Sequence, residues 1–252
     1  NVSAAEGSFT PEMKQSYDDK GFLVVERLFS EEELAGVRQQ IDALVADPDN
    51  PPQGVTVGRE GDTNPETKGT GEIRGAAFMV RYVPYFQEFA RTPKLLECVR
   101  GLLGPRVKVF RDQMLLKPPG GQAKPLHQDQ SYFQVTPEDD LVTAWIALDE
   151  ATLDNGCMTY VPGSHKHGIF PIGNDPERPV HHIPDTGDLD LPDPVHCPVP
   201  VGSLIFHHGC SLHASADNNS ASWRKALIFH FATSDSSSAR DELNEQVSLE
   251  ID

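Results

Sequence analysis

The sequence predicts a single-domain α+β protein, mainly β, with a β-sandwich or jelly-roll core and flanking N-terminal helices. Helical patterns occupy the first part of the chain and strand-like runs occupy the rest, an order typical of α+β folds. The 21 prolines and 20 glycines are spread along the chain, as turns between many short strands require. A length of 252 residues fits one large domain of this kind.

Residues from about 10 to 105 are predicted to form the helical part. Thr10 followed by Pro11 is typical of a helix start, and this helix should end at Gly21. Ser30 and Glu33 form a capping box ahead of apolar residues at helical spacing, which predicts a second helix. The other expected segments are a short strand at 22–25, a long loop at 48–75 and an amphipathic helix at 84–103 that breaks at Pro93.

Residues from about 106 to 233 are predicted to form the jelly-roll core. Short β-branched or aromatic runs alternate there with Gly, Pro and Asp, which is the pattern of strands and turns. Residues 171–198 lack this pattern and are expected to form an insert on the rim of the core, while the Ser-rich, acidic tail 234–252 is expected to be mobile. The predicted strands are 107–110, 114–116, 142–148, 158–161, 203–206 and 226–231.

Charge and cysteine content exclude several classes of protein. The formal net charge is −17, so nucleic acid or an anionic membrane surface would be repelled, and we expect neither as a partner. No apolar run is long enough to span a membrane, and no segment has the pattern of a signal peptide. The four cysteines form no CxxC pair, which predicts reduced thiols in a cytoplasmic protein.

A possible metal site begins with His127 and Asp129. In an extended segment, residues two apart project to the same side, so these two could offer a nitrogen and a carboxylate to one ion. Such a tripeptide alone is weak evidence for a metal site. His213, however, follows a later apolar strand and could complete a set of two histidines and one carboxylate. That set leaves coordination positions open and is diagnostic of non-haem Fe(II) oxygenases. His207 and His208 lie close to His213 in the sequence and are alternative ligands.

A possible anion site lies just beyond this histidine. Arg224 stands 11 residues after His213, at the start of the apolar run 226–231. A planar guanidinium is the natural bidentate partner of a carboxylate, such as the distal carboxylate of a 2-oxo diacid. Ser215 could add a hydroxyl. An arginine at the edge of a strand, however, also has an ordinary structural explanation.

These motifs resemble the phytanoyl-CoA dioxygenase family of Fe(II)/2-oxoglutarate oxygenases. The order and spacing of the blocks agree with that family over roughly residues 10–235. The matching blocks are Met114-Leu-Leu-Lys-Pro-Pro, Pro125-Leu-His-Gln-Asp-Gln-Ser-Tyr-Phe, Ala144-Trp-Ile-Ala-Leu, Asn155-Gly-Cys-Met, Val161-Pro-Gly-Ser-His-Lys-His-Gly, His213-Ala-Ser and Trp223-Arg-Lys-Ala.

The resemblance implies a double-stranded β-helix core, of the jelly-roll or cupin-like type. It implies Fe(II) on His127, Asp129 and His213, and 2-oxoglutarate and O2 as co-substrates. It also implies that the C5 carboxylate of 2-oxoglutarate is held by Arg224, with Ser215 nearby. The residues expected along the co-substrate are Gln128, Trp145 and, by a looser match, Arg81.

Within this resemblance, two pairs of residues have competing explanations. The spacing to Arg224 favours His213 over His207 and His208 as the third ligand. His165 and His167 look like a second metal pair, but in the family's block they fit a turn rich in hydrogen bonds better.

The predicted function is hydroxylation of an unactivated C–H bond in a small-molecule metabolite, with release of succinate and CO2. Asp129 is retained, whereas related halogenases replace that carboxylate to admit chloride. Desaturation, epimerisation or cyclisation at the same iron site is an alternative outcome, and a non-catalytic, cupin-like metal-binding protein is another. Phe78, Tyr132 and Phe133 could line the substrate pocket or belong to the core, while loops 48–75 and 171–198 are expected to cover it. The sequence does not indicate the oligomeric state.

Overall fold

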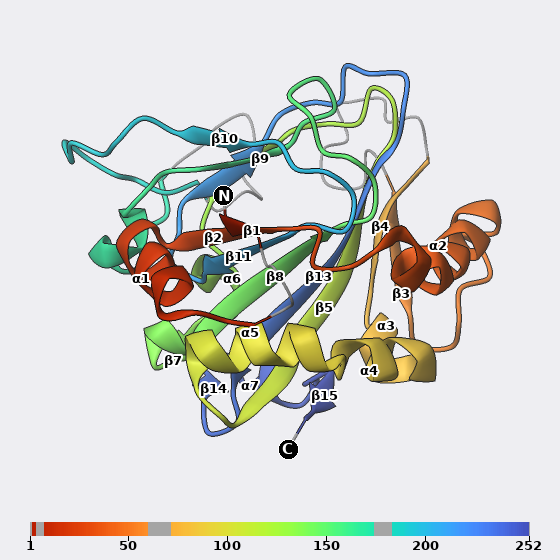
Figure 1. The fold of residues 1–252 in the computed structure, drawn as a ribbon, viewed down its shortest axis with the longest axis horizontal. Helices are drawn as coiled ribbons and strands as arrows, with labels where there is room; N and C mark the ends of the chain where they lie inside the picture. The colour runs from red at the N-terminus through yellow and green to blue at the C-terminus, as the bar shows by residue number, and fades with distance from the viewer. Residues whose placement is uncertain (1, 4–7, 60–71, 174–182, 252) are drawn as a thin grey trace.

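Two facing β-sheets form the core of the protein (Figure 1). The computed structural model describes residues 2–3, 8–59, 72–173 and 183–251. Its larger sheet has the order β1 (Val2–Ser3), β2 (Phe22–Glu26), β11 (Leu204–His208), β8 (Leu141–Ala147), β13 (Arg224–Thr233), β5 (Val107–Lys117), β4 (Ile73–Ala77) and β3 (Thr56–Arg59), and β15 (Leu249–Glu250) also pairs with β5. The smaller sheet has the order β10 (Val195–Cys197), β9 (Met158–Tyr160), β12 (His213–Ser215) and β6 (Lys124–His127).

The helices begin where the sequence places their caps. The Thr10 side chain accepts a hydrogen bond from the Met13 amide, and the capping box of Ser30 and Glu33 is formed in both directions. The predicted helix 84–103 is divided before Pro93, because a proline lacks the amide hydrogen that continues a helix. The helices are α1 (Pro11–Lys20), α2 (Glu31–Ala46), α3 (Met79–Tyr82), α4 (Pro84–Ala90), α5 (Pro93–Leu103), α6 (Gln130–Phe133) and α7 (Asp241–Asn244), with 3-10 turns η2 (Glu138–Asp140) and η3 (Ser164–His167).

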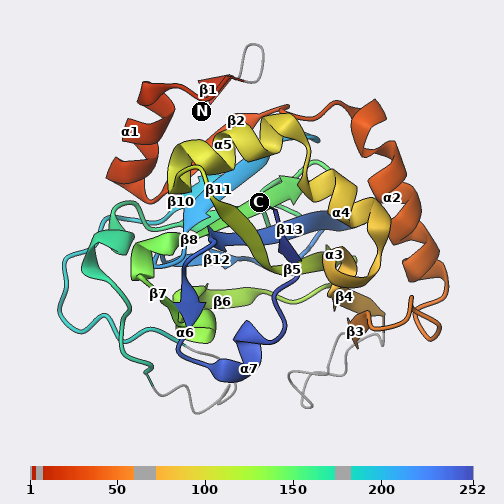
Figure 2. The ribbon, with the colours of Figure 1, turned by 90° about the horizontal axis from the view of Figure 1, so that it is seen from below.

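The larger sheet is buried on both faces, because helices cover one face and the smaller sheet covers the other. Figures 1 and 2 show α4 and α5 against the helix-covered face, and Figure 1 shows β9 and β10 on the opposite side. In β8, Ala144 and Ile146 pack with the helices, whereas Trp145 packs with Tyr160 of the smaller sheet. This strand therefore looks continuously apolar in sequence, although its side chains alternate between two cores.

The C-terminal tail is folded, contrary to the expectation that it would be mobile. β14 (Ser237–Ser238) pairs with β7 (Val135–Thr136), and Leu249 pairs with Val109 of β5. Leu243 and Val247 pack against a small apolar cluster, and the Arg111 guanidinium donates to the Leu243 and Gln246 carbonyls at 2.9 and 2.5 Å. Such contacts are not readable from a Ser-rich, acidic composition.

The two predicted loops contain regular structure where they are described. Residues 48–75 include β3 and the start of β4, which extend the larger sheet beyond β5, and residues 171–198 include β10, which pairs with β9. The predicted strands 107–110 and 114–116 are one strand, β5. Residues 60–71 and 174–182, which belong to the predicted covers, lie outside the described residues.

All four cysteines are buried and free, as predicted for reduced thiols. Burial raises the pKa of Cys98, Cys197 and Cys210 to about 12, so these thiols stay protonated at neutral pH. None of the helices in the described part of the chain combines the length and the apolar character needed to cross a membrane.

Candidate metal centre and co-substrate pocket

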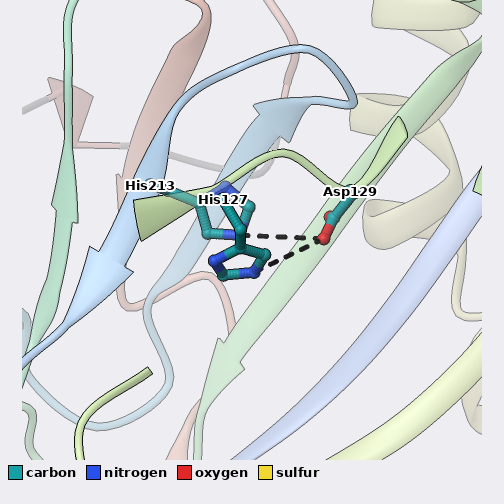
Figure 3. Close-up of side chains that lie close together, drawn as sticks. All are labelled: His127, Asp129 and His213. Atoms are coloured by element: carbon teal, nitrogen blue, oxygen red, sulfur yellow. Dashed lines mark ion pairs between the residues drawn. The ribbon is translucent and has the colours of Figure 1, made fainter. Parts of the chain in front are cut away.

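His127, Asp129 and His213 converge at one end of the smaller sheet (Figure 3). His127 ends β6 and His213 begins β12, and the two residues are direct partners across these antiparallel strands. The Nε2 atoms of His127 and His213 lie 3.9 and 3.7 Å from Oδ1 of Asp129. One potential ligand atom from each residue falls within 4.8 Å of the others, so the three side chains can hold a single ion.

The backbone brings Asp129 to this point by a turn and not by strand alternation. The segment is not extended as predicted, because β6 ends at His127 and Asp129 has helical dihedral angles (φ −63°, ψ −36°) at the start of α6. The pairing of β6 with β12 then supplies the second histidine. The expected grouping is therefore present, although the reason first given for it was wrong.

Both histidines present a lone pair toward the ion position. Nδ1 of His127 lies 2.8 Å from the Pro125 carbonyl, and Nδ1 of His213 lies 3.0 Å from the Ser211 carbonyl. A carbonyl can only accept, so each Nδ1 carries the proton and each Nε2 is free to bind a metal. Burial, together with the charges of His213 and Lys124, holds the pKa of His127 well below its usual range. Burial and the charge of His207 lower the pKa of His213 to about 4.

The second oxygen of Asp129 is fixed by hydrogen bonds. Oδ2 accepts from the Thr143 hydroxyl at 2.6 Å and from Nε2 of His207 at 3.0 Å. His230 supports Thr143, because its Nδ1 lies 2.8 Å from the Thr143 hydroxyl. Burial would raise the pKa of Asp129, but the charge of His213 and the hydrogen bonds from His207 and His230 outweigh it and hold this pKa well below its usual range. Oδ1 is thereby left to the metal as a single ligand atom.

The alternative histidines have other partners. His207 uses Nε2 to donate to Asp129 and Nδ1 to accept from the Tyr160 hydroxyl at 3.0 Å. His208 faces Asp139, with 3.2 Å between its Nε2 and the carboxylate, and its Nδ1 accepts from a backbone amide. His165 and His167 lie in the short turn η3, and among the described residues the metal-binding group comprises the original three residues alone.

A cavity of about 420 Å³ opens beside the three residues. Its lining includes all three of them and, among the predicted site residues, Trp145, Ser215 and Arg224. Tyr132 and Phe133 also line it, whereas Phe78 is absent from the lining and instead lies against Tyr82 and Arg111.

Arg224 is the residue whose surroundings best fit an anionic ligand. Only 2% of the residue is exposed, yet its Nε and Nη1 have no hydrogen-bond partner among the described residues. Its guanidinium lies 5.5 Å from the ring centre of Trp145, whose own Nε1 likewise has no hydrogen-bond partner in this part of the chain. Burying unpaired donors is costly, so the site fits an anionic ligand such as the distal carboxylate of 2-oxoglutarate. Ser215 also lines the cavity, and its hydroxyl accepts from the Lys117 ammonium at 2.9 Å.

Two of the predicted co-substrate residues lie elsewhere. The Gln128 side chain is fully buried and bonds to the carbonyls of Gly168 and Cys210, so it ties two loops together away from the cavity. Arg81 points to the C-terminal segment, where it donates to the carbonyls of Glu245 and Val247. The expectations for these two residues are corrected accordingly.

Several lining residues were not identified from the sequence. Thr143 and His230 fix Asp129, and Arg74, Lys117 and Lys124 add positive charge to the cavity. A signal for some of them was available, because Thr143 lies two residues before Trp145, and His230 lies six after Arg224. Even spacing along a strand places both pairs on the same inner face. Arg74 carries no comparable signal.

Two facing sheets carry two histidines and one carboxylate at one end, beside a buried arginine with donors suited to an anion. This fold and this site define a non-haem iron, 2-oxoglutarate-dependent oxygenase. The model of the phytanoyl-CoA dioxygenase family matches residues 17–226. The chain therefore belongs to the phytanoyl-CoA dioxygenase family.

Curated relatives agree with this assignment. The peroxisomal phytanoyl-CoA dioxygenase of Homo sapiens is 29% identical over 241 residues, covering 90% of this chain and 69% of that protein. A probable alpha-ketoglutarate-dependent hypophosphite dioxygenase of Stutzerimonas stutzeri is 28% identical over 232 residues, covering 89% and 79%.

Solved structures show the same fold. The non-heme alpha ketoglutarate dependent carbocyclase SnoK from nogalamycin biosynthesis has a TM-score of 0.73 at 22% identity, covering 99% of this chain and 95% of that one. EctD from S. alaskensis, solved with 2-oxoglutarate and 5-hydroxyectoine, has a TM-score of 0.73 at 21% identity, covering 92% and 79%. The prediction of a mainly β, jelly-roll core with flanking helices is confirmed.

Proposed function

We propose that the protein hydroxylates an unactivated C–H bond of a small-molecule metabolite, using Fe(II), 2-oxoglutarate and O2. The observation that carries the proposal is a single cavity that contains both the three-residue metal centre and the Arg224 guanidinium, whose Nε and Nη1 have no hydrogen-bond partner among the described residues. In the overall reaction, one oxygen atom enters the substrate as a hydroxyl group. The other enters succinate, as 2-oxoglutarate loses CO2.

Each residue has a defined task in this proposal. His127, Asp129 and His213 would hold the iron, leaving coordination positions open for the co-substrates. Arg224, with the Trp145 Nε1–H beside it, would bind the distal carboxylate of 2-oxoglutarate. Iron and 2-oxoglutarate, when bound, supply the oxidising chemistry, and the protein supplies placement and a cavity walled by two sheets.

Other outcomes are possible at the same kind of site. Among proteins with this fold, SnoK is named a carbocyclase, so the fold and the cofactors do not dictate the product. Retention of Asp129 supports oxygen insertion over halogenation. A non-catalytic, cupin-like protein would not explain why two buried guanidinium nitrogens of Arg224 have no hydrogen-bond partner among the described residues.

The four buried, free cysteines also support a reducing compartment, and we propose the cytoplasm.

Labelled oxygen distinguishes hydroxylation from the alternatives. The protein is incubated with Fe(II), 2-oxoglutarate, a metabolite that it converts and O2 carrying the heavy isotope. Succinate and product are then analysed by mass spectrometry. Hydroxylation predicts one heavy oxygen atom in the product for each succinate formed. Succinate formation with a product free of the label would instead assign desaturation or cyclisation if the product has lost two hydrogen atoms, and epimerisation if it is an isomer of the substrate.

A further inference from the structure

The cavity is positively charged although the chain is strongly acidic. Four cationic side chains line it, whereas Asp129 is its single carboxylate among the described residues. The whole chain, by contrast, carries a formal net charge of −17. Concentrating cations in an enclosed site is unfavourable unless anions enter, so the lining indicates which ligands the cavity accepts. The four cations are Arg74, Lys117, Lys124 and Arg224.

The cofactors of the proposed function do not neutralise this charge. The two positive charges of Fe(II) and the single charge of Arg224 are balanced by Asp129 together with the two carboxylates of 2-oxoglutarate. The charge of Lys124 takes no part in this balance. A neutral substrate would leave it uncompensated inside the cavity.

Lys124 is the remaining cation best placed to meet a substrate. It begins β6, the strand that ends in His127, and it lies opposite Ser215 of β12. Its ammonium donates to the Tyr132 hydroxyl at 3.2 Å and lies 4.9 Å from the centre of that ring. No carboxylate of the described residues lies within ion-pair distance of this ammonium.

Lys117 differs from Lys124 because its donors are already engaged within the protein. Its ammonium donates to the Ser215 hydroxyl and the Ala216 carbonyl, close to the position proposed for 2-oxoglutarate. Lys124, in contrast, is held by a hydroxyl and an aromatic face, neither of which neutralises its charge. Tyr132 therefore orients the ammonium and leaves its charge available to a ligand.

We propose that the substrate of this enzyme is a compact anion, and that its carboxylate or phosphate group binds against the Lys124 ammonium and the Tyr132 hydroxyl. This inference rests on the proposed function, since it takes the iron and 2-oxoglutarate positions as given. A cavity of about 420 Å³ that also holds the co-substrate favours a compact molecule. Lys124 acts here as a specificity-determining residue, three positions before the metal ligand His127.

The test uses the charge-transfer absorption of the anaerobic Fe(II)–2-oxoglutarate protein as its signal. Butyrate is compared with butyramide, a pair that separates charge from shape, and propyl phosphate is compared with propanol, which lacks the anionic group. In the wild-type protein, each anion should shift the band with a half-saturating concentration at least tenfold below that of its neutral partner, equivalent to about 1.4 kcal/mol. The Lys124→Met variant should lose this preference, and Lys124→Arg should retain it.

Lys166→Met is the matched control, because Lys166 is an exposed lysine in η3, outside the cavity. It should behave as the wild type. Loss of the band, as opposed to a shift, marks displacement of 2-oxoglutarate and counts against the proposal. Equal or tighter binding of the neutral partners, no response to any anion, or an anion preference that persists in Lys124→Met would overturn it. Failure of the band to form at all would instead contradict the proposed function.

Discussion

The two carboxylate oxygens of Asp129 face different neighbours. Oδ1 faces the Nε2 atoms of His127 and His213, while Oδ2 accepts from Thr143 and His207. Hydrogen bonds to the second oxygen keep the carboxylate from turning both oxygens toward a metal. The protein thus prepares a single-atom carboxylate ligand, which keeps coordination positions open for co-substrates.

The Thr143 hydroxyl can be tested by removing it without changing side-chain shape. In Thr143→Val, Asp129 loses the donor at 2.6 Å, and we expect the affinity for Fe(II) to fall by about 10- to 100-fold. Competition titration with a chelator of known affinity measures this change. Thr143→Ser restores the hydroxyl and should bind iron nearly as the wild type does. A Val variant with wild-type affinity would remove Thr143 from this role.

Arg224 can be tested through the requirement for 2-oxoglutarate. In Arg224→Met the co-substrate loses a buried, charged partner, which costs about 2 kcal/mol or more and should raise the apparent KM for 2-oxoglutarate about 30-fold. Iron affinity should stay close to that of the wild type. Arg106→Met is the control, because the Arg106 side chain is 64% exposed and lies outside the cavity. An unchanged KM in Arg224→Met would reject the assignment.

The buried histidines predict acid sensitivity of the metal-free protein. The pKa of His213 is lowered to about 4, whereas an unfolded histidine titrates near about 6.5. Between these values the unfolded chain binds more protons, so stability is lost as pH falls through this window, by about 1 kcal/mol per pH unit. Urea denaturation of the metal-free protein at several pH values measures the slope. His213→Gln should reduce it, and an unchanged slope would contradict the account.

Among the elements, the strands of the larger sheet explain which site residues the sequence could reveal. Arg224 and His230 share one face of β13, and Thr143 and Trp145 share one face of β8, as even spacing requires. Arg224 and Trp145 were predicted, while Thr143 and His230 were missed, because chemistry alone does not mark a threonine or a strand histidine as functional. For Gln128 the sequence predicted a role in the site that the structure does not support. Its position inside a metal motif suggested a co-substrate role, but the turn after β6 directs its amide into the loops.

The C-terminal segment shows a different limit of sequence analysis. Its composition predicts mobility, yet it supplies backbone carbonyls to Arg111, a residue only 6% exposed. Burial lowers the pKa of Arg111 to about 10, so these acceptors stabilise a charge that would otherwise be poorly solvated. Backbone acceptors have no sequence signature, so the hydrogen bonds between Arg111 and the tail carbonyls could not be predicted from the tail sequence.

Truncation tests the contribution of this segment. A chain ending at Ser238 loses α7, β15 and the Leu243 and Gln246 carbonyls that accept from Arg111, and we expect the free energy of unfolding to fall by about 2 kcal/mol or more. Urea denaturation followed by tryptophan fluorescence measures the change. Gln246→Ala keeps the accepting backbone carbonyl and should have a much smaller effect. A truncated chain as stable as the wild type would show that the tail contributes nothing.

For the molecule as a whole, the facing sheets convert distant residues into one site. His127 and His213 meet by strand pairing, and Arg224 reaches the same cavity from the larger sheet. The order of the motifs predicted which residues belong to this site, but it did not predict how deeply they are buried. The burial of Arg224 without a partner and the excess of cations in the cavity emerge only from the packed structure.

The central claim is that this cavity binds Fe(II) and 2-oxoglutarate together. Anaerobic titration of the metal-free protein with Fe(II) and 2-oxoglutarate, followed by visible absorption, tests it most directly. We predict a charge-transfer band that saturates at one iron and one 2-oxoglutarate per chain and is abolished in His127→Ala and His213→Ala. Absence of the band in the wild-type protein, or its persistence in either alanine variant, would contradict the account.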